Sequence, residues 1–167
     1  MILITTSRKP SRRTRRFCRE LEAVLPLSRY VNRGKAPLRL ISERARADGY
    51  YRVLIVGETK GNPSIIRVLD LRTNPFRWMG QLYISEVFLL LDVKTRPQRV
   101  DEDDLVVDAG EWRVLEDIFD VYDGEEGVVL REREGTVCFL LDGQEVGPRF
   151  KITGWDPVPE KLGSALR

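Results

Sequence analysis

One amphipathic segment near the amino terminus constrains the fold more than any other feature of this sequence. Its apolar side chains recur at the spacing of a single buried helical stripe: Phe17, Leu21, Val24 and Leu25. At about 100° per residue, the opposite side of such a helix carries four arginines, which are Arg12, Arg15, Arg16 and Arg19. The spacing therefore predicts a helix over residues 11–25 with one side in a core and the other in solvent.

A strand precedes this helix, and the same order of elements returns later in the chain. An apolar run predicts the strand over 2–5, and helical spacing predicts further helices over 38–48 and around 112–119. Additional strands are expected at 29–31, 51–56, 64–71, 76–82, 87–93, 127–133, 136–141 and 150–152. In both halves a strand is followed by a helix and then by further strands. This order predicts an α/β fold of two similar halves with mixed sheets and helices.

Length and composition favour one compact domain. The chain has 167 residues, of which 42% are hydrophobic and 32% are charged. A chain of this size buries enough surface to fold without a metal or a disulfide. We expect a single domain over 1–167, with approximate halves at 1–95 and 96–155 and a short C-terminal tail at 156–167.

The near-neutral net charge of +2 hides two opposed regions. Residues 1–46 contain 13 Lys or Arg and 3 Asp or Glu, whereas residues 100–134 contain 3 basic and 14 acidic side chains. Arginine supplies 22 of the 28 cations, and its planar fork matches pairs of phosphate oxygens and stacks on bases. The amino-terminal region therefore favours a polyanionic partner. A heat-adapted ion-pair surface or codon bias would also enrich arginine.

Residue types that are absent exclude several kinds of chemistry. The sequence contains no histidine, which removes the usual general base and the commonest metal ligand. Cys18 and Cys138 lie far apart, so neither a zinc site nor a disulfide framework is indicated. The longest apolar run, Val87 to Leu91, is too short to span a bilayer, and we expect a cytoplasmic protein in a reducing setting.

Two further motifs fail as ligand sites. Asp101, Asp103 and Asp104 cluster at the start of the acidic region, but they lack the alternating ligands and turn glycine of a calcium loop. The loop over 57–63 has no Gly-Lys pair at a strand-to-helix turn, so it is not a Walker motif. We expect no metal, no cofactor and no catalytic residue. The acidic region then repels RNA or receives a basic protein partner.

The arginine side of the first helix adds little to the stability of the free protein. Like charges one turn apart repel, and cations near a helix N-terminus oppose the helix dipole. A phosphate ligand would compensate both costs. A turn at Asn32–Lys35 presents two further cations, and the helix over 38–48 exposes more: Arg39, Arg44 and Arg46.

Three segments together resemble the Brix domain family of ribosome-biogenesis proteins. They are Thr5-Thr6-Ser7-Arg8-Lys9-Pro10-Ser11, Tyr30-Val31-Asn32-Arg33-Gly34-Lys35 and Glu145-Val146-Gly147-Pro148-Arg149-Phe150. The resemblance runs from about Ile4 to Trp155 and is closest to small stand-alone archaeal members. It implies two similar halves related to the anticodon-binding domain of class II aminoacyl-tRNA synthetases. It further implies binding of precursor ribosomal RNA and no enzymatic activity.

The resemblance carries an RNA-contact role onto Arg8, Arg12 and Arg33. Arg149 of the third segment either contacts RNA or pairs with an acid. Together with the helix and the turn, these considerations define the predicted RNA-binding set: Arg8, Lys9, Arg12, Arg13, Arg15, Arg16, Arg19, Arg33, Lys35, Arg39 and Arg149.

The sequence thus predicts a monomeric assembly factor that binds precursor ribosomal RNA through an arginine-rich helix face and assists its folding and processing. Ribosomal proteins or other assembly factors are possible partners. The alternative is a protein interaction module that docks a basic ribosomal protein through its acidic half.

Overall fold

The computed structural model describes residues 1–94, 99–100, 104–119 and 126–157. Its amino-terminal part contains two helices and five strands: β1 (Ile2–Thr6), α1 (Arg12–Val24), β2 (Ser28–Tyr30), α2 (Leu38–Ala47), β3 (Arg52–Thr59), β4 (Asn62–Asp70) and β5 (Arg77–Phe88). A 3-10 helix, η1 (Leu90–Val93), follows. The remaining elements are β6 (Leu105–Asp108), α3 (Val114–Phe119), β7 (Val128–Arg133), β8 (Thr136–Leu141), β9 (Gln144–Glu145) and β10 (Arg149–Asp156).

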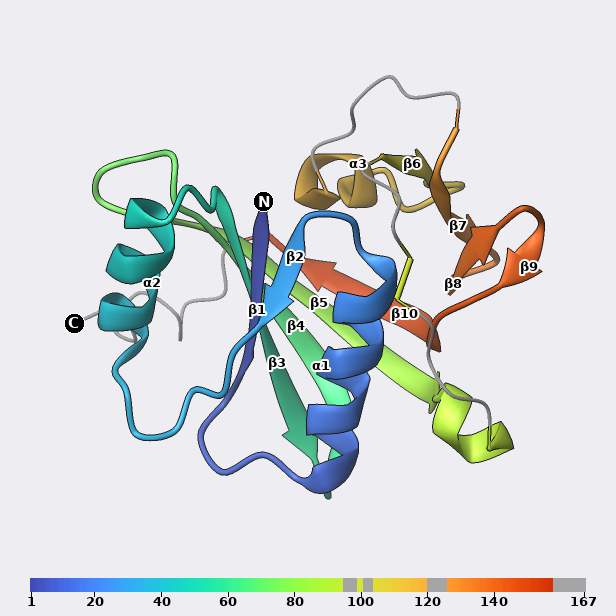
Figure 1. Ribbon diagram of the computed structural model, residues 1–167, viewed down its shortest axis with the longest axis horizontal. Coiled ribbons are helices and arrows are strands. Elements are labelled where there is room, and N and C mark those ends of the chain that lie inside the picture. The colour runs from blue at the N-terminus through green and yellow to red at the C-terminus, as the bar shows by residue number, and fades with distance from the viewer. Residues whose placement is uncertain (95–98, 101–103, 120–125, 158–167) are drawn as a thin grey trace.

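The ten strands of the described residues form one mixed sheet (Figure 1). Its order is β2-β1-β3-β4-β5-β10-β8-β7-β6, and β9 pairs with β8 outside this path. The sequence predicted separate mixed sheets, whereas β5 and β10 pair antiparallel, with Ile84 opposite Ile152, and join the strands into one. That pairing spans a long stretch of chain, so no local spacing could reveal it.

The two ends of the sheet share one connectivity. β1 and β3 are parallel, and β4 and β5 then continue antiparallel. At the other end β6 and β7 are parallel, and β8 and β10 continue antiparallel. The predicted boundary near residue 95 lies outside the described residues, so the division into halves remains a prediction.

Alternate residues of the strands pack into two hydrophobic cores, one on each face of the sheet. α1 and α3 cover one face, where Phe17, Leu21 and Leu115 pack with strand residues from both ends of the sheet. α2 covers the other face, where Leu38 and Ala45 pack on a smaller set: Leu3, Val53, Ile55 and Leu69. The predicted buried stripe of α1 is confirmed, because Phe17, Leu21, Val24 and Leu25 are all buried.

Most predicted elements are present, with two instructive differences. The expected loop over 57–63 is a tight hairpin in which Lys60 and Gly61 both have positive φ, the backbone that a two-residue turn requires. The strand expected at 87–93 is wrong, since the chain leaves β5 and turns into η1. Asp92 explains this change because its carboxylate accepts a hydrogen bond from the Leu89 amide at the start of the turn, at 2.9 Å.

None of the helices in the described part of the chain has the length and apolar character that a membrane span requires.

Candidate nucleic-acid interface

The N-terminus of α1 is fixed by two side chains. Ser11 is the N-cap, and its hydroxyl accepts a hydrogen bond from the Thr14 amide at 3.1 Å. Glu58 at the end of β3 accepts hydrogen bonds from the Ser11 amide, at 2.9 Å, and from the Thr14 hydroxyl. Burial acts to raise the pKa of Glu58, but these hydrogen bonds outweigh it and hold the pKa below its usual value. The Glu58 carboxylate of β3 therefore supplies the negative charge that the first turn of α1 lacks.

The arginines of α1 separate into two stripes with different surroundings. The first stripe is Arg12, Arg15 and Arg19, whose side chains are all exposed. In the part of the chain that the structure describes, no carboxylate pairs with any of the three. α1 packs beside β2, and burial raises the pKa of the Tyr30 hydroxyl on that strand, whereas the charges of Arg15 and Arg19 act to lower it. This stripe faces solvent along the β2 edge of the sheet.

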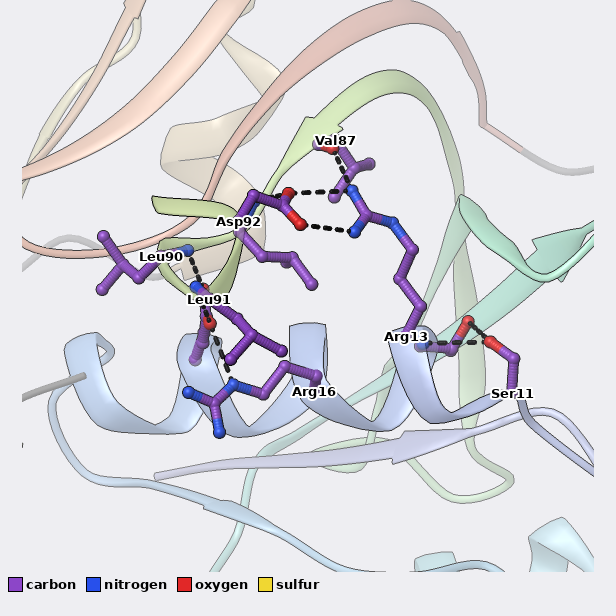
Figure 2. A network of polar contacts seen from close by, with 10 residues as sticks. Ser11, Arg13, Arg16, Val87, Leu90, Leu91 and Asp92 are labelled. Atoms are coloured by element: carbon purple, nitrogen blue, oxygen red, sulfur yellow. Dashed lines mark hydrogen bonds and ion pairs between the residues drawn. The ribbon is translucent and has the colours of Figure 1, made fainter. Parts of the chain in front are cut away.

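The second stripe, Arg13 and Arg16, faces η1 instead. Arg13 donates two hydrogen bonds to the Asp92 carboxylate, at 3.0 and 3.1 Å, and one to the Val87 carbonyl at 2.7 Å. Figure 2 shows the Arg13 guanidinium reaching from α1 toward Asp92 and Val87, with Arg16 beside Leu90 and Leu91. The expected outward position of Arg16 is therefore corrected: its side chain is only 28% exposed and pairs with Glu20 at 3.0 Å.

Glu20 connects Arg16 of this second stripe to η1. Its side chain is fully buried, and its carboxylate accepts hydrogen bonds from the amides of Leu90, at 2.8 Å, and Leu91, at 3.3 Å. Arg16 neutralises the buried charge from the solvent side. Helical spacing could not reveal the partner of Arg13, because Asp92 lies 79 residues along the chain, whereas the partner of Arg16 lies one turn away on the same helix.

The turn after β2 places the next cations at the same edge of the sheet. The Val31 amide bonds to the Ile4 carbonyl at 2.9 Å, and the Tyr30 hydroxyl donates to the Asn32 side chain at 2.8 Å. Arg33 is half-buried, and its Nε donates to the Ala36 carbonyl at 3.3 Å. Burial lowers the pKa of Arg33, and the positive charges of Arg8 and Arg67 lower it further. The predicted cations Arg8, Lys9 and Lys35 are exposed.

Two other predicted RNA contacts have acidic partners. Arg39 on α2 pairs with Glu43 at 2.8 Å, one turn along the same helix. Arg149 pairs with Glu145 at 3.0 Å, and its guanidinium lies 5.3 Å from the centre of the Phe88 ring. The second of the two roles left open for Arg149, pairing with an acid, is therefore seen, and its contact with RNA stays a prediction.

The third Brix-like segment buries Gly147, Pro148 and Phe150 in the core and leaves Glu145 and Arg149 exposed. Phe150 meets Phe17 of α1 edge-to-face, with ring centroids 5.7 Å apart. A Cβ on Gly147 would approach the Val24 side chain to 2.9 Å and Phe139 to 3.1 Å. Only a glycine lets this segment pack against α1, so the segment fastens β10 and its neighbours to the helix.

The sequence analysis did not single out Arg67, a further cation of this region. Arg67 of β4 lies on the face that α2 partly covers, and only the period-two alternation of 64–71 could have signalled it. Asp101 and Asp103 lie outside the described residues, whereas Asp104 is exposed. Among the described residues, no group of three potential metal ligands comes together.

The sheet order and the basic helix together define a class of mixed α/β protein with a cationic edge. Two solved structures share this fold. A probable ribosomal biogenesis protein from Aeropyrum pernix is 27% identical, with a TM-score of 0.76, over 90% of this chain and 94% of that one. Mil, described as an archaeal Imp4-like protein, is 26% identical, with a TM-score of 0.70, over 93% of this chain and 99% of that one.

Sequence relatives identify the family. A probable Brix domain-containing ribosomal biogenesis protein from Methanopyrus kandleri is 37% identical over 146 residues, which cover 83% of this chain and 73% of that protein. The chain therefore belongs to the Brix domain-containing ribosomal biogenesis proteins. A relative from Pyrococcus horikoshii with the same description is 40% identical over 89 residues, which cover 53% of this chain and about two fifths of that protein. A scan against family models gave no match.

Proposed function

We propose that this protein is a ribosome biogenesis factor that binds precursor ribosomal RNA through the exposed stripe Arg12, Arg15 and Arg19. One observation carries the proposal: these three arginines have no carboxylate partner among the described residues, while their neighbours Arg13 and Arg16 do. The names of its relatives, ribosomal biogenesis proteins, support the same role.

The energetics of the stripe favour a phosphate ligand. Three guanidinium groups three and four residues apart repel one another by a few tenths of a kcal/mol per pair in the free protein. RNA phosphates would replace that repulsion with charge-assisted hydrogen bonds and release counterions. Arg8, Arg33 and Lys35 extend the cationic surface around the β2 edge. Arg13 holds η1 and Arg16 pairs with Glu20, while Arg39 and Arg149, which also have acidic partners, remain in the predicted set.

The role is one of binding, without bond chemistry. The protein would hold precursor RNA in a foldable arrangement in pre-ribosomal particles, in the cytoplasm of its cell. We further propose that the protein is monomeric and that its fold is related to the anticodon-binding domain of class II aminoacyl-tRNA synthetases.

The proposal is tested by RNA affinity as a function of salt. If the stripe and the turn neutralise about five phosphates of single-stranded RNA, the log-log slope is about −3 to −4, since each contributes about −0.7. The variant Arg15→Glu/Arg19→Glu should lose binding and retain its thermal stability. Arg77→Glu/Arg113→Glu, which makes the same charge change at exposed positions on β5 and before α3, is the matched control. A salt-independent affinity, or equal loss in both variants, would refute the proposal.

The acidic region supports the second candidate function. Several of its described carboxylates are exposed: Asp104, Glu111, Asp117, Glu126 and Glu134. They would dock a basic ribosomal protein, and that protein would then hold the RNA. A pull-down with and without ribonuclease separates the two functions, because a direct protein partner survives digestion.

A further inference from the structure

A pocket opens between β2 and α2, on the face of the sheet that α2 covers. Its volume is about 340 Å³, and ligand-binding cavities span about 300–1,000 Å³. β2 ends the sheet order and is only three residues long, whereas α2 packs farther in, over Val53 and Leu69. The hydrophobic core on this face is therefore partly open along the β2 edge. We call this opening the β2–α2 pocket.

The base of the β2–α2 pocket is apolar. Leu3 of β1 and Ala45 of α2 line it and are buried. Three further side chains of the lining pack against the same core but stay partly exposed: Val31, Ile41 and Tyr50. The Tyr50 amide donates to the Ala45 carbonyl at 2.9 Å, which holds this residue at the C-terminal end of α2. The pocket therefore offers an aromatic ring and two aliphatic side chains to a ligand.

Three arginines line the same pocket, each from a different segment of the chain. Arg29 of β2 is the register partner of Leu3, so both side chains lie on the α2 face of the sheet. Arg33 belongs to the turn after β2, and its carbonyl accepts a hydrogen bond from the Ala36 amide at 3.2 Å. Arg44 reaches the pocket from the last turn of α2. One cavity thus collects positive charge from a strand, a turn and a helix.

This positive charge is only partly compensated. Within the described ranges, none of the three arginines pairs with a carboxylate. Among the described lining residues, Asp48 is the one acid, and it is exposed. The pocket therefore joins an excess of positive charge to an apolar, partly aromatic surface. These two properties match a ligand that combines a phosphate with a flat ring.

We propose that the β2–α2 pocket binds one unpaired nucleotide of the RNA, with its base against Ile41 and Tyr50 and its phosphate against the three arginines. This site rests on the proposed function and adds to it a contact with a base. Unpaired RNA bases stack on aromatic side chains and guanidinium planes, whereas the bases of a duplex stay stacked on their neighbours. The exposed stripe of α1 borders the same edge of the sheet, because α1 packs beside β2. One single strand of RNA can therefore contact both.

Abasic RNA tests the contact with the base. A short single-stranded RNA and an abasic chain of the same length carry the same phosphates, so the ratio of their affinities reports contacts with bases. Stacking of one base on an aromatic side chain strengthens binding about fivefold or more. Ile41→Trp fills the pocket, and Leu40→Trp places the same side chain at the neighbouring exposed position of α2, outside the pocket.

We expect the wild type and Leu40→Trp to prefer the RNA that has bases by that factor, and Ile41→Trp to lose most of the preference. The Tm of each variant shows that it is folded. A wild type that binds both chains equally, or an equal preference in the two variants, would overturn the site. In the first case the protein would contact phosphates alone.

Arg44→Gln tests the contact with the phosphate without adding a bulky side chain. Arg46→Gln is the matched control, because both arginines are exposed in the last turn of α2. The Arg46 guanidinium lies 4.7 Å from the centre of the Phe76 ring, and Arg46 does not line the pocket. We expect Arg44→Gln to weaken RNA binding severalfold and to make the salt slope shallower by about 0.7, and Arg46→Gln to match the wild type. Equal affinities and slopes for the two variants would also overturn the site.

The two proposals fail in different ways. If Arg15→Glu/Arg19→Glu abolishes RNA binding while Ile41→Trp behaves like Leu40→Trp, the pocket fails and the proposed function stands. If Arg15→Glu/Arg19→Glu binds RNA as well as its control does, while Ile41→Trp alone loses the preference for bases, the pocket stands and the exposed stripe fails.

Discussion

Arg13 of α1 and Asp92 of η1 form a two-pronged ion pair, with hydrogen bonds of 3.0 and 3.1 Å between residues 79 positions apart. The same carboxylate accepts a hydrogen bond from the Leu89 amide, so it both begins η1 and attaches it to α1. An arginine of the predicted RNA-binding set therefore holds η1 against α1. Within one helix, the partner of each cation decides its role.

The first prediction concerns pH. The hydrogen bonds from Arg13 lower the pKa of Asp92, and the Leu89 amide lowers it further. A carboxyl group whose pKa is lower in the folded state stabilises the fold above its unfolded pKa, and this contribution disappears as the pH falls through the folded pKa. Denaturant unfolding of the wild type and Asp92→Asn should therefore differ at neutral pH and converge in acid. A difference that is constant with pH would contradict this role for Asp92.

The second prediction separates the two stripes of α1. Arg16→Glu removes the partner of the buried Glu20 and places a second carboxylate beside it. We expect it to lower the free energy of unfolding by about 2–4 kcal/mol, because Glu20 keeps only its amide hydrogen bonds. Arg12→Glu makes the same charge change at an exposed position and should stay within about 0.5 kcal/mol of the wild type. Equal stabilities in chemical denaturation would show that Arg16 is not structural.

The third prediction concerns the packing of the third Brix-like segment. In Gly147→Ala the new methyl group meets Val24 and Phe139 at closer than ordinary contact. Overpacking of this kind costs about 1–3 kcal/mol, so the Tm should fall by several degrees. Gly57→Ala is the control, because its nearest contact would be an ordinary 3.8 Å to Ile65. RNA affinity measured below the Tm should remain unchanged in Gly147→Ala, and a selective loss of affinity would instead place this segment at the RNA.

The sequence determined the local elements and their faces. The spacing of Phe17, Leu21, Val24 and Leu25 fixed α1 and its buried stripe, because a helix brings residues three and four apart onto one side regardless of the rest of the fold. Alternation within strands gave most of the sheet in the same way. The spacing of Arg12, Arg15 and Arg19 placed them in solvent, where the structure has them.

The tertiary structure decided which of these elements meet. It paired β5 with β10 and made one sheet, it gave Arg13 its partner Asp92 on η1, and it brought the Leu90 amide to Glu20, the partner of Arg16. Periodicity reports which side of an element is buried, but not which distant group lies against it. That choice depends on the packing of the whole chain, where a carboxylate from a remote turn can turn a solvent-facing cation into a structural one.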